Sequence, residues 1–568
     1  GNAARTTAIL QQTLDNSTAT FTNWDFKNVW DPGSVCDYPR LRWQNEPLKV
    51  SCVLHDGSDN ATSVSRSAEI QIGFNRPLDN NTLIFGDTLQ IKPAISLEKF
   101  SYDNTTQILT LQPSAPLQEA TTYSIQFQSI QTNDHLSSLD NYTHTFTTSQ
   151  LGATWFKATD NAGFAAINNS RLEAFQHKLW LLGGNNNSVS NQVWTSENGV
   201  DWSIFSTSTQ SLEMWGQRQN HSSAVFQDKL WVLGGHSGAG ANPNSIWSSP
   251  NGVTWSITEN SEWSKRWRPS TVVFQDKLWV IGGYHSGWKN DAWSSADGSN
   301  WIQESSQVWP SGGAETAAVA FDGKLWVLGG WQGPLPGILT NTIRNSSDGK
   351  TWQTITPTGS IWEPRWDHQA IVFDNKIWVI GGEARNDSSD PDSNYNDVWY
   401  STDGRNWLEV APSANWSARS RFTSTIFDNK IWIATGDNGA GQRFNDVWYT
   451  EGSGLIVASM RDNATDVNLT PELWMRLSYP VNPDSLNPTN FFLQQDNGSL
   501  VSGKPLLDPD NITIRFVPDG PLAYSTAYQL IGTPGLKKQS DNKSIFQSDR
   551  SLHFTTHPDL DTDPALVL

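Results

Sequence analysis

Six copies of one short pattern constrain the fold of this 568-residue chain more than any other feature. Each copy consists of Phe, two variable residues, Lys, Leu or Ile, and Trp, and successive Trp residues lie 47–54 positions apart. The copies are FQHKLW (175–180), FQDKLW (226–231), FQDKLW (274–279), FDGKLW (321–326), FDNKIW (373–378) and FDNKIW (427–432). A repeat of this length indicates units that each bury an apolar face against their neighbours.

Each copy reads as four short strands. The variable pair inside the pattern is typical of a tight turn between two strands, and the apolar run that follows is typical of a buried central strand. Gly-Gly comes next in five copies and Thr435-Gly436 in the sixth. A second aromatic segment follows in every copy except the fourth, which has Thr342-Ile343-Arg344 in its place. A turn containing Asn-Gly or Asp-Gly and a third Trp complete the first five copies. Four strands in about 50 residues predict a propeller blade, with Trp side chains filling the space between blades.

The stretch LGATWFKATD (151–160) stands before the first copy but contains the Gly-x-x-Trp that ends a blade. The sixth copy lacks this final element after Trp448. We therefore predict that residues 151–158 form the last strand of blade six, with Trp155 in the place of the third Trp. Such a strand closes the propeller and leaves no open sheet edge. The alternative is a chance Gly-x-x-Trp in a linker.

Residues 151–454 resemble the kelch family of β-propellers in its bacterial form, and the resemblance implies six blades. Segments 48–150 and 455–556 both contain Asp-Asn-Ala-Thr and end in THTFTT and SLHFTT. They resemble the Ig-like domains of prokaryotic surface-layer proteins, which implies β-sandwiches. Residues 1–47 resemble the end of a GLUG-type β-solenoid, and residues 557–568 form an acidic tail. We predict an all-β chain with a six-bladed kelch-like β-propeller between two Ig-like β-sandwiches.

Composition excludes some partners and indicates an extracellular location. The formal net charge of −19 argues against binding to nucleic acid or to an anionic membrane surface. No apolar run is long enough for a membrane helix. The chain does not begin with Met, so we expect a piece of a longer precursor. Its two cysteines, Cys36 and Cys52, are predicted to form a disulfide, with two free thiols as the alternative.

Asn-x-Ser/Thr sequons are frequent and fit a secreted, glycosylated surface. The candidate glycosylation sites are Asn16, Asn60, Asn104, Asn141, Asn186, Asn220, Asn345, Asn415, Asn463, Asn468, Asn511 and Asn542.

A Trp-x-x-Arg motif precedes four of the blades and supplies the first candidate binding residues. The arginines are Arg218, Arg266, Arg365 and Arg419, with His221 and His368 nearby. If they surround one mouth of the central channel, they form a site for an anion or a sugar, because guanidinium binds carboxylates in a two-pronged geometry. The alternative is structural, with each Arg stacked on its Trp and bonded to loop carbonyls, and the repetition favours it.

The loops after Gly-Gly supply further candidates. Tyr284, Trp288 and Trp331 are expected either to contact sugars or a protein partner, or to pack on the propeller face. The loop 386–397 contains Asp387, Asp390 and Asp392, a candidate calcium site, and no other cofactor is expected.

The chain lacks sequence signatures of catalysis, including nucleophile triads, metal-spaced histidine pairs, phosphate loops and dinucleotide fingerprints. We therefore expect a non-enzymatic, extracellular cell-surface protein that is a structural subunit of a surface layer, a filament or an adhesin. Its expected partners are copies of itself, other surface proteins and glycans. The alternative is a carbohydrate-binding protein or glycan-acting enzyme that uses the propeller face.

Overall fold

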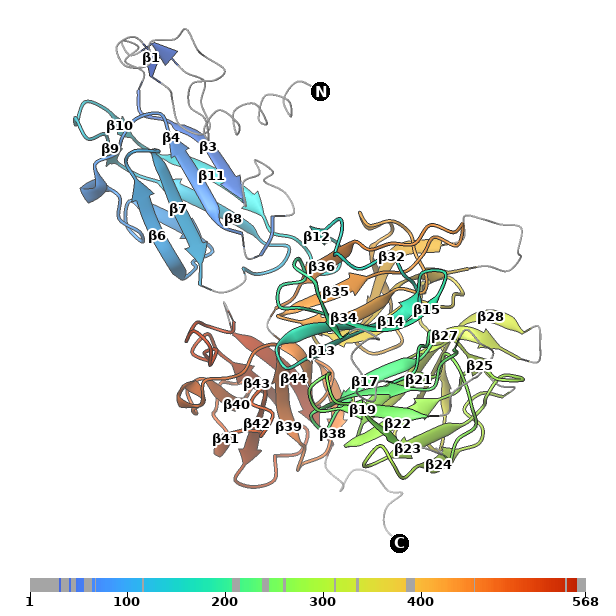
Figure 1. The fold of residues 1–568 in the computed structure, drawn as a ribbon. Coiled ribbons are helices and arrows are strands. Elements are labelled where there is room, and N and C mark those ends of the chain that lie inside the picture. Colours follow the sequence, from blue (N-terminus) through green and yellow to red (C-terminus); the bar gives the residue numbers. More distant parts are fainter. Residues whose placement is uncertain are drawn as a thin grey trace. The chain divides into compact units, whose positions relative to one another are not determined.

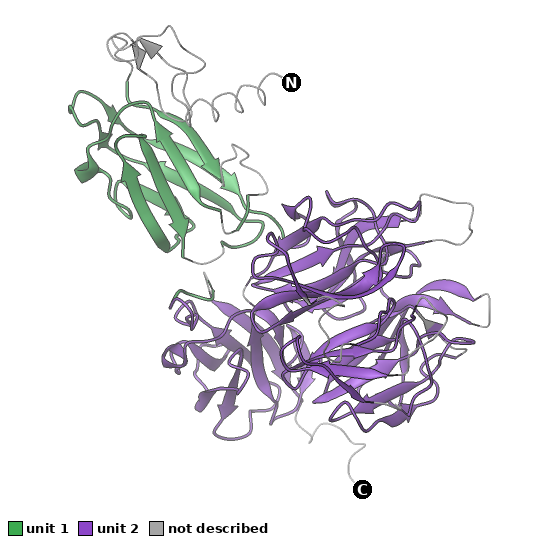
Figure 2. Cartoon of the chain, viewed as in Figure 1, with its two compact units in different colours: residues 1–150, 543–548 green, residues 151–542, 549–568 purple. Residues whose placement is uncertain are grey.

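β-Strands form nearly all the regular structure of the residues described below, in a computed structural model of the chain (Figure 1). The structure describes residues 30–31, 40–41, 47–55, 64–66, 68–114, 117–206, 215–237, 245–258, 262–310, 313–333, 337–384, 394–453, 455–546 and 549–558. The chain divides into two compact units, residues 1–150 with 543–548 and residues 151–542 with 549–568 (Figure 2).

The first unit contains a sandwich of two antiparallel sheets, in the strand orders β3-β4-β7-β6 and β11-β8-β5. Alternate residues of these strands are buried and meet in one apolar core, as expected for a sandwich. The elements of the first unit are β1 (Trp30–Asp31), β2 (Arg40–Leu41), β3 (Val50–His55), β4 (Ile70–Phe74), η1 (Asn80–Thr82), β5 (Leu89–Lys92), β6 (Leu97–Asp103), β7 (Ile108–Pro113), β8 (Thr122–Phe127), β9 (Ile130–Gln131), β10 (Ser138–Leu139) and β11 (Tyr142–Thr147). Most of the GLUG-like segment lies outside the described residues.

The second unit contains the propeller, and its described residues form six antiparallel sheets, one for each sequence copy. The first strands of the sheets lie side by side in a closed circle, in the order β13, β17, β21, β26, β30, β34 and again β13. The strands of blades one to three are β13 (Arg171–Phe175), β14 (Lys178–Asn185), β15 (Val189–Ser196), β16 (Ser203–Ser206), β17 (Ser222–Phe226), β18 (Lys229–Leu233), β19 (Ile246–Ser249), β20 (Ser256–Thr258), β21 (Ser270–Phe274), β22 (Lys277–Ile281), β23 (Ala292–Ser295) and β24 (Ile302–Ser305).

Blades four to six follow the same plan. Their strands are β25 (Gly313–Ala314), β26 (Ala317–Phe321), β27 (Lys324–Gln332), β28 (Ile338–Ser346), β29 (Gln353–Ile355), β30 (Gln369–Phe373), β31 (Lys376–Glu383), β32 (Asn394–Ser401), β33 (Leu408–Ala411), β34 (Thr423–Phe427), β35 (Lys430–Ala434), β36 (Val447–Glu451) and β12 (Phe156–Thr159).

The repeated Phe-x-x-Lys-x-Trp pattern is explained by the turn between the first two strands of each blade. Both central residues of the turn have positive φ, as in Asp374 and Asn375, so the turn matches the twist of the strands. In all six copies the Trp indole donates a hydrogen bond of 2.7–3.0 Å to the carbonyl of the Phe five residues earlier. The pattern therefore builds one hairpin and fixes its indole at the blade surface.

That indole fills the space between blades, as predicted. In each case it packs against the turn glycine of the next blade. The six pairs are Trp180 with Gly252, Trp231 with Gly298, Trp279 with Gly349, Trp326 with Gly404, Trp378 with Gly152, and Trp432 with Gly199. Each glycine has positive φ, and a Cβ added there would overlap the indole, so the contact requires glycine.

The closing strand predicted from LGATWFKATD is confirmed. β12 pairs with β36 and completes the sheet β12-β36-β35-β34 of blade six. The indole of Trp155 is buried and donates to the carbonyl of Gly152 at 2.8 Å. The third Trp residues of the first four blades make the same bond three residues back, at 3.0–3.2 Å. Gly152 and Trp155 thus supply the contacts of a blade from the opposite end of the propeller segment.

A second sandwich follows the propeller in the same unit, with sheets in the orders β37-β39-β42-β41 and β38-β44-β43-β40. Its elements are β37 (Leu455–Ala458), β38 (Ala464–Val467), β39 (Leu473–Leu477), η2 (Pro483–Ser485), β40 (Phe491–Gln495), β41 (Gly503–Leu507), β42 (Thr513–Pro518), β43 (Ala527–Gly532) and β44 (Arg550–Thr556).

The hairpin turns of blades five and six hold this sandwich. The Asn375 side chain donates to the carbonyl of Met460 at 3.1 Å and accepts from the backbone of Ala458 at 3.1 Å. Asp374 accepts a hydrogen bond from Arg550 at 2.6 Å. These turns read Asp-Asn, whereas the turns of blades two and three read Gln-Asp. The blades whose turns read FDNK, and not FQDK, are therefore blades that also hold the second sandwich.

We predict that Gly152→Ala destabilises the propeller more than Gly359→Ala. Both glycines have positive φ, but a Cβ at position 152 meets Trp378, whereas nothing lies within 4 Å of one at position 359. Overpacking of this kind costs about 1–3 kcal/mol. Thermal unfolding and the rate of proteolysis report the difference, and equal melting temperatures for the two variants would contradict the role of Gly152 in closing the propeller.

Candidate functional site

The repeated arginines do not line the channel mouth, so their prediction as ligand-binding residues is wrong. Arg218, Arg266, Arg365 and Arg419 are 0–2% exposed. Each guanidinium lies 5.3–5.9 Å over the ring of the Trp three residues earlier. Each also donates to a backbone carbonyl at the end of the second strand, at 2.8–3.1 Å. The structural alternative is confirmed, because every charged group is occupied inside the protein.

Three of these arginines are neutralised by a carboxylate within their own blade. Arg266 donates two hydrogen bonds to Asp291, at 2.6 and 2.9 Å. Arg365 and Arg419 make the same two-pronged contact with Asp397 and Asp446. The fourth departs from the pattern.

Arg218 meets Ser245 at the position of these aspartates. Burial lowers its pKa to about 10. The chain therefore retains one buried guanidinium without the carboxylate that the other three have.

The two candidate histidines are also internal, so the prediction that His221 binds a ligand is wrong, whereas His368 borders the central cavity and its predicted role is untested. His221 and His368 are 0% and 4% exposed, and their ring nitrogens have no hydrogen-bond partner among the described residues. Burial lowers the pKa of His368 to about 3, and the charge of Arg365 acts in the same direction. Blade six has Phe422 at the equivalent position. The histidines thus fill a site for an uncharged ring.

A different set of polar residues surrounds the channel. One residue at the start of each blade's first strand has φ between 49° and 58° and lines the central cavity. These six residues, which we call the polar ring, are Asn169, Asn220, Arg268, Glu315, Asp367 and Arg421. Backbone hydrogen bonds of 2.7–3.3 Å join neighbours within it, from Asn169 to Arg421, Asn220 to Asn169, Arg268 to Asn220, and Arg421 to Asp367. The shared conformation directs all six toward the propeller axis.

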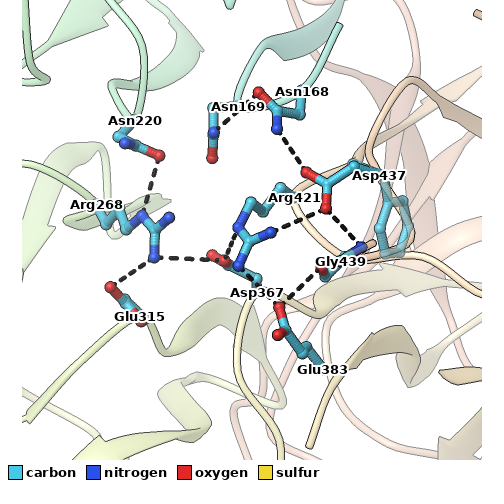
Figure 3. Close-up of polar contacts among 12 residues, drawn as sticks. Asn168, Asn169, Asn220, Arg268, Glu315, Asp367, Glu383, Arg421, Asp437 and Gly439 are labelled. Carbon is cyan, nitrogen blue, oxygen red and sulfur yellow. Dashed lines mark hydrogen bonds and ion pairs between the residues drawn. The ribbon is translucent and has the colours of Figure 1, made fainter. Parts of the chain in front are cut away.

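Five of the six side chains of the polar ring are joined directly in one network, and Asn169 is linked to it through Asn168 and Asp437 (Figure 3). Arg268 donates to Asn220 at 3.0 Å and to Glu315 at 2.6 Å, and lies 3.3 Å from Asp367. Arg421 lies 3.2 Å from the same oxygen of Asp367. Asp367 therefore bridges the two arginines.

Two residues outside the ring extend the network around Arg421 (Figure 3). Its guanidinium donates to Glu383 at 2.8 Å and to Asp437 at 2.9 Å. Arg421 is thus surrounded by three carboxylates.

Burial and charge shift the pKa values of this network. Burial lowers the pKa of Arg268, but Asp367 and Glu315 outweigh it and raise the pKa above its ordinary value. Burial raises the pKa of Glu315 to about 7, against the opposing charge of Arg268. Below the ring, burial raises the pKa of Glu173 to about 7 as well. The ring and the first strands enclose a cavity of about 190 Å³.

A second row of residues, which we call the rim, stands beside the polar ring. Each rim residue directly follows the Gly-Gly of its blade, or Thr-Gly in blade six, and pairs with the residue just before the ring position. The rim consists of Asn185, His236, Tyr284, Trp331, Glu383 and Asp437. Blades two to four thus present aromatic side chains here, and the other blades present carboxylates or an amide.

The three predicted aromatic residues lie at or beside the rim and are half-buried. Tyr284 stacks on Trp267, with centroids 5.3 Å apart, and Trp288 lies edge-on to it at 4.9 Å. Trp331 contacts Trp366 at 6.0 Å, and Trp366 lies 5.1 Å from both Arg268 and Arg421. They pack on the propeller face, as one of the two predictions expected, and keep part of their surface accessible.

Sequence reasoning missed the polar ring, although a signal was present. Each ring residue lies six positions before the Phe of the repeated pattern. Aligning the copies on that Phe gives Asn, Asn, Arg, Glu, Asp and Arg in one column. A column that is polar in every copy but differs in identity indicates a shared location without a shared structural contact.

Other predicted sites have mixed outcomes. The prediction of Asn345 as a glycosylation site is wrong, because this residue lies in β28 and is only 5% exposed. Cys52 is disulfide-bonded, and the only other cysteine, Cys36, lies outside the described residues. Asn16, Asn60 and the calcium candidates Asp387, Asp390 and Asp392 also lie outside them.

No cluster of His, Cys, Asp or Glu in the described part of the chain is suited to hold a metal ion. None of the described helices has the length and apolarity needed to cross a membrane.

We predict that Ser245→Asp stabilises the protein. The new carboxylate supplies the partner that Arg218 lacks, and hydrogen bonds to charged groups contribute about 1.5–3 kcal/mol. The matched control is Asp291→Ser, which leaves Arg266 without its carboxylate and lowers stability. Thermal unfolding measures both effects. A lower melting temperature for Ser245→Asp would show that blade two does not need the ion pair.

We predict that His368→Phe reduces the sensitivity of the protein to acid. The pKa of His368 is near 3 in the folded state and about 6.5 when unfolded, so its contribution to stability is present above pH 6.5 and is lost as the pH falls. At pH 5 the difference amounts to about 2 kcal/mol. Melting temperatures at pH 8 and pH 5 test this, and parallel losses in variant and parent would contradict it.

Comparison with known proteins agrees with this architecture. Residues 169–382 and 315–455 match the family described as "KLHDC2/KLHL20/DRC7 Kelch-repeats domain". Residues 47–148 and 455–556 match the family described as "Bacterial Ig-like domain". Bacterial Ig-like domains are typical of surface or extracellular proteins, and their combination with kelch repeats fits a surface or interaction protein.

Two curated proteins match short segments. One is "Leucine-zipper-like transcriptional regulator 1 homolog" of Drosophila melanogaster, 31% identical over 114 residues, which are 20% of this chain and 12% of that protein. The other is "Dynein alpha chain, flagellar outer arm" of Chlamydomonas reinhardtii, 36% identical over 89 residues, or 15% and 2%. The chain thus spans only a small part of either relative. The kelch match covers half of the chain, which therefore belongs to the kelch-repeat family and carries two bacterial Ig-like domains.

Proposed function

We propose that this chain is a non-catalytic, extracellular cell-surface protein of the adhesin type, which binds its partner with the end of the propeller that carries the polar ring and the rim. One observation carries the proposal. Positions that build the propeller keep nearly the same residue in every blade, whereas positions of the ring and the rim differ from blade to blade. Structural repeats need the first kind of position, and recognition of an asymmetric partner needs the second.

The docked sandwich leaves this end available. It is held by Asp374 and Asn375, in a turn at the far end of the first strand from the polar ring. The propeller and this sandwich therefore form a support with the rim at its opposite end. Because the repeated arginines and the two histidines are buried inside the blades, a binding role fits the accessible residues better than the catalytic alternative does.

A second candidate function is a structural subunit that polymerises through the second sandwich. β41 is an edge strand, and Leu506 on it is 46% exposed. Val517 on the neighbouring β42 is 43% exposed, and Leu500 just before β41 is 71% exposed. An edge strand with apolar neighbours is suited to pair with another chain.

Binding to cell envelopes tests the first function. The full chain, labelled and added to envelope preparations of the source organism, is expected to bind, and Trp331→Ala is expected to weaken binding at least tenfold, since interface aromatic residues commonly contribute 2 kcal/mol or more. The matched control is Tyr524→Ala, an exposed aromatic residue of the second sandwich. Equal binding by Trp331→Ala and the control would contradict a role for the rim.

Negative-stain imaging separates the second function from the first. An adhesin is expected to give single particles. Regular polymers of the chain alone, abolished by Leu506→Lys but not by Trp331→Ala, would instead support the structural subunit.

A further inference from the structure

The polar ring retains unused hydrogen-bonding groups. Oε2 of Glu315 and Nε1 of Trp366 are buried and have no hydrogen-bond partner among the described residues. The same holds for Nε1 of Trp288, beside the rim. Buried polar groups are normally satisfied, so three such atoms around one mouth indicate a ligand that supplies both donors and acceptors.

Charge narrows the class of ligand. The cavity under the ring is lined by three arginines, Arg171, Arg268 and Arg421, and by three acids, Glu173, Glu315 and Asp367. At pH 8, above the raised pKa values of the two glutamates, these charges balance. An anion entering the mouth is repelled by the carboxylates around Arg421, and a cation is repelled by the arginines. A neutral ligand with closely spaced hydroxyl groups suffers neither repulsion, because each hydroxyl both donates and accepts.

The rim adds flat apolar surface on one side only. Tyr284, Trp288 and Trp331 come from blades three and four, while the carboxylates Glu383 and Asp437 belong to blades five and six. Aromatic rings bury large apolar areas at low entropic cost. A ligand with one apolar face and a polar edge therefore matches the mouth, since its face covers the aromatic side and its edge reaches the polar ring.

We infer that the mouth binds a neutral saccharide residue. A pyranose has the required combination, because its C–H groups form an apolar face and its hydroxyls form a polar edge. On this inference, which rests on the proposed function, Trp331 and Tyr284 contact the sugar face. Arg268 and Glu315 bond adjacent hydroxyls as donor and acceptor. The ligand is either a free sugar or the end of a surface polysaccharide, and both share this chemistry.

A glycan array probed with the full chain at pH 8 tests the inference. Neutral oligosaccharides ending in galactose, glucose or mannose are expected to bind, and sialylated or sulfated ones are not. Trp331→Ala is expected to reduce neutral binding at least tenfold, while Tyr524→Ala leaves it unchanged. Titration with the methyl glycoside of the bound sugar then distinguishes the sources. Full affinity indicates a free sugar, and affinity tenfold lower than for the oligosaccharide indicates a polymer end.

Glu315→Gln provides a specific test of the charge argument. It removes one carboxylate but keeps an acceptor for Arg268, so the mouth becomes cationic. We expect neutral binding to fall and binding of sialylated glycans to appear, with thermal unfolding confirming that the variant is folded. Binding by the parent protein to acidic glycans alone, or to no glycan, would overturn the inference. If the rim variant still loses envelope binding in that case, the proposed function stands and only the ligand class fails.

Discussion

Packing of an indole against a glycine in the next blade is the contact on which the propeller depends. A buried Trp removes roughly 150–250 Å² from water, so each contact contributes several kcal/mol. Six such contacts arise from six blades only if the circle closes. The contact between Trp378 and Gly152 joins residues from distant parts of the chain, and the strand that follows Gly152, β12, pairs with β36 at the edge of blade six. The same segment thus closes the propeller and supplies one of the six contacts between blades.

The closed propeller has two ends along its axis, and the side chains at these ends can differ from blade to blade. At one end the hairpin turns have a fixed backbone shape, yet their side chains point outward, and Asp374 and Asn375 use this to hold the second sandwich. At the other end the ring positions have a fixed backbone shape with positive φ, and their side chains point to the axis. In both places a conserved conformation carries varied chemistry. The fold therefore separates stability, which lies between blades, from recognition, which lies at the ends.

The sequence predicts the fold well because the interactions that form it are local and repeated. The Phe-to-Trp hydrogen bond spans five residues, and the third Trp bonds a glycine three residues back, so both leave periodic marks. Even the closing strand was predictable, since it copies an element missing from the last blade. The arginines were also marked by repetition, but their location was not. Arg266 and Asp291 are 25 positions apart, and only the folded blade shows that they meet.

The polar ring could not be assembled from sequence for a further reason. Its members come from six blades, and their contacts join residues far apart in the chain, such as Asn169 with Arg421, which are 252 positions apart. A repeat alignment places them in one column but says nothing of the direction of their side chains. That direction follows from the positive φ of each residue, which non-glycine residues adopt rarely. Six such residues in one circle indicate that the propeller maintains a costly conformation to hold this set of polar side chains at its axis.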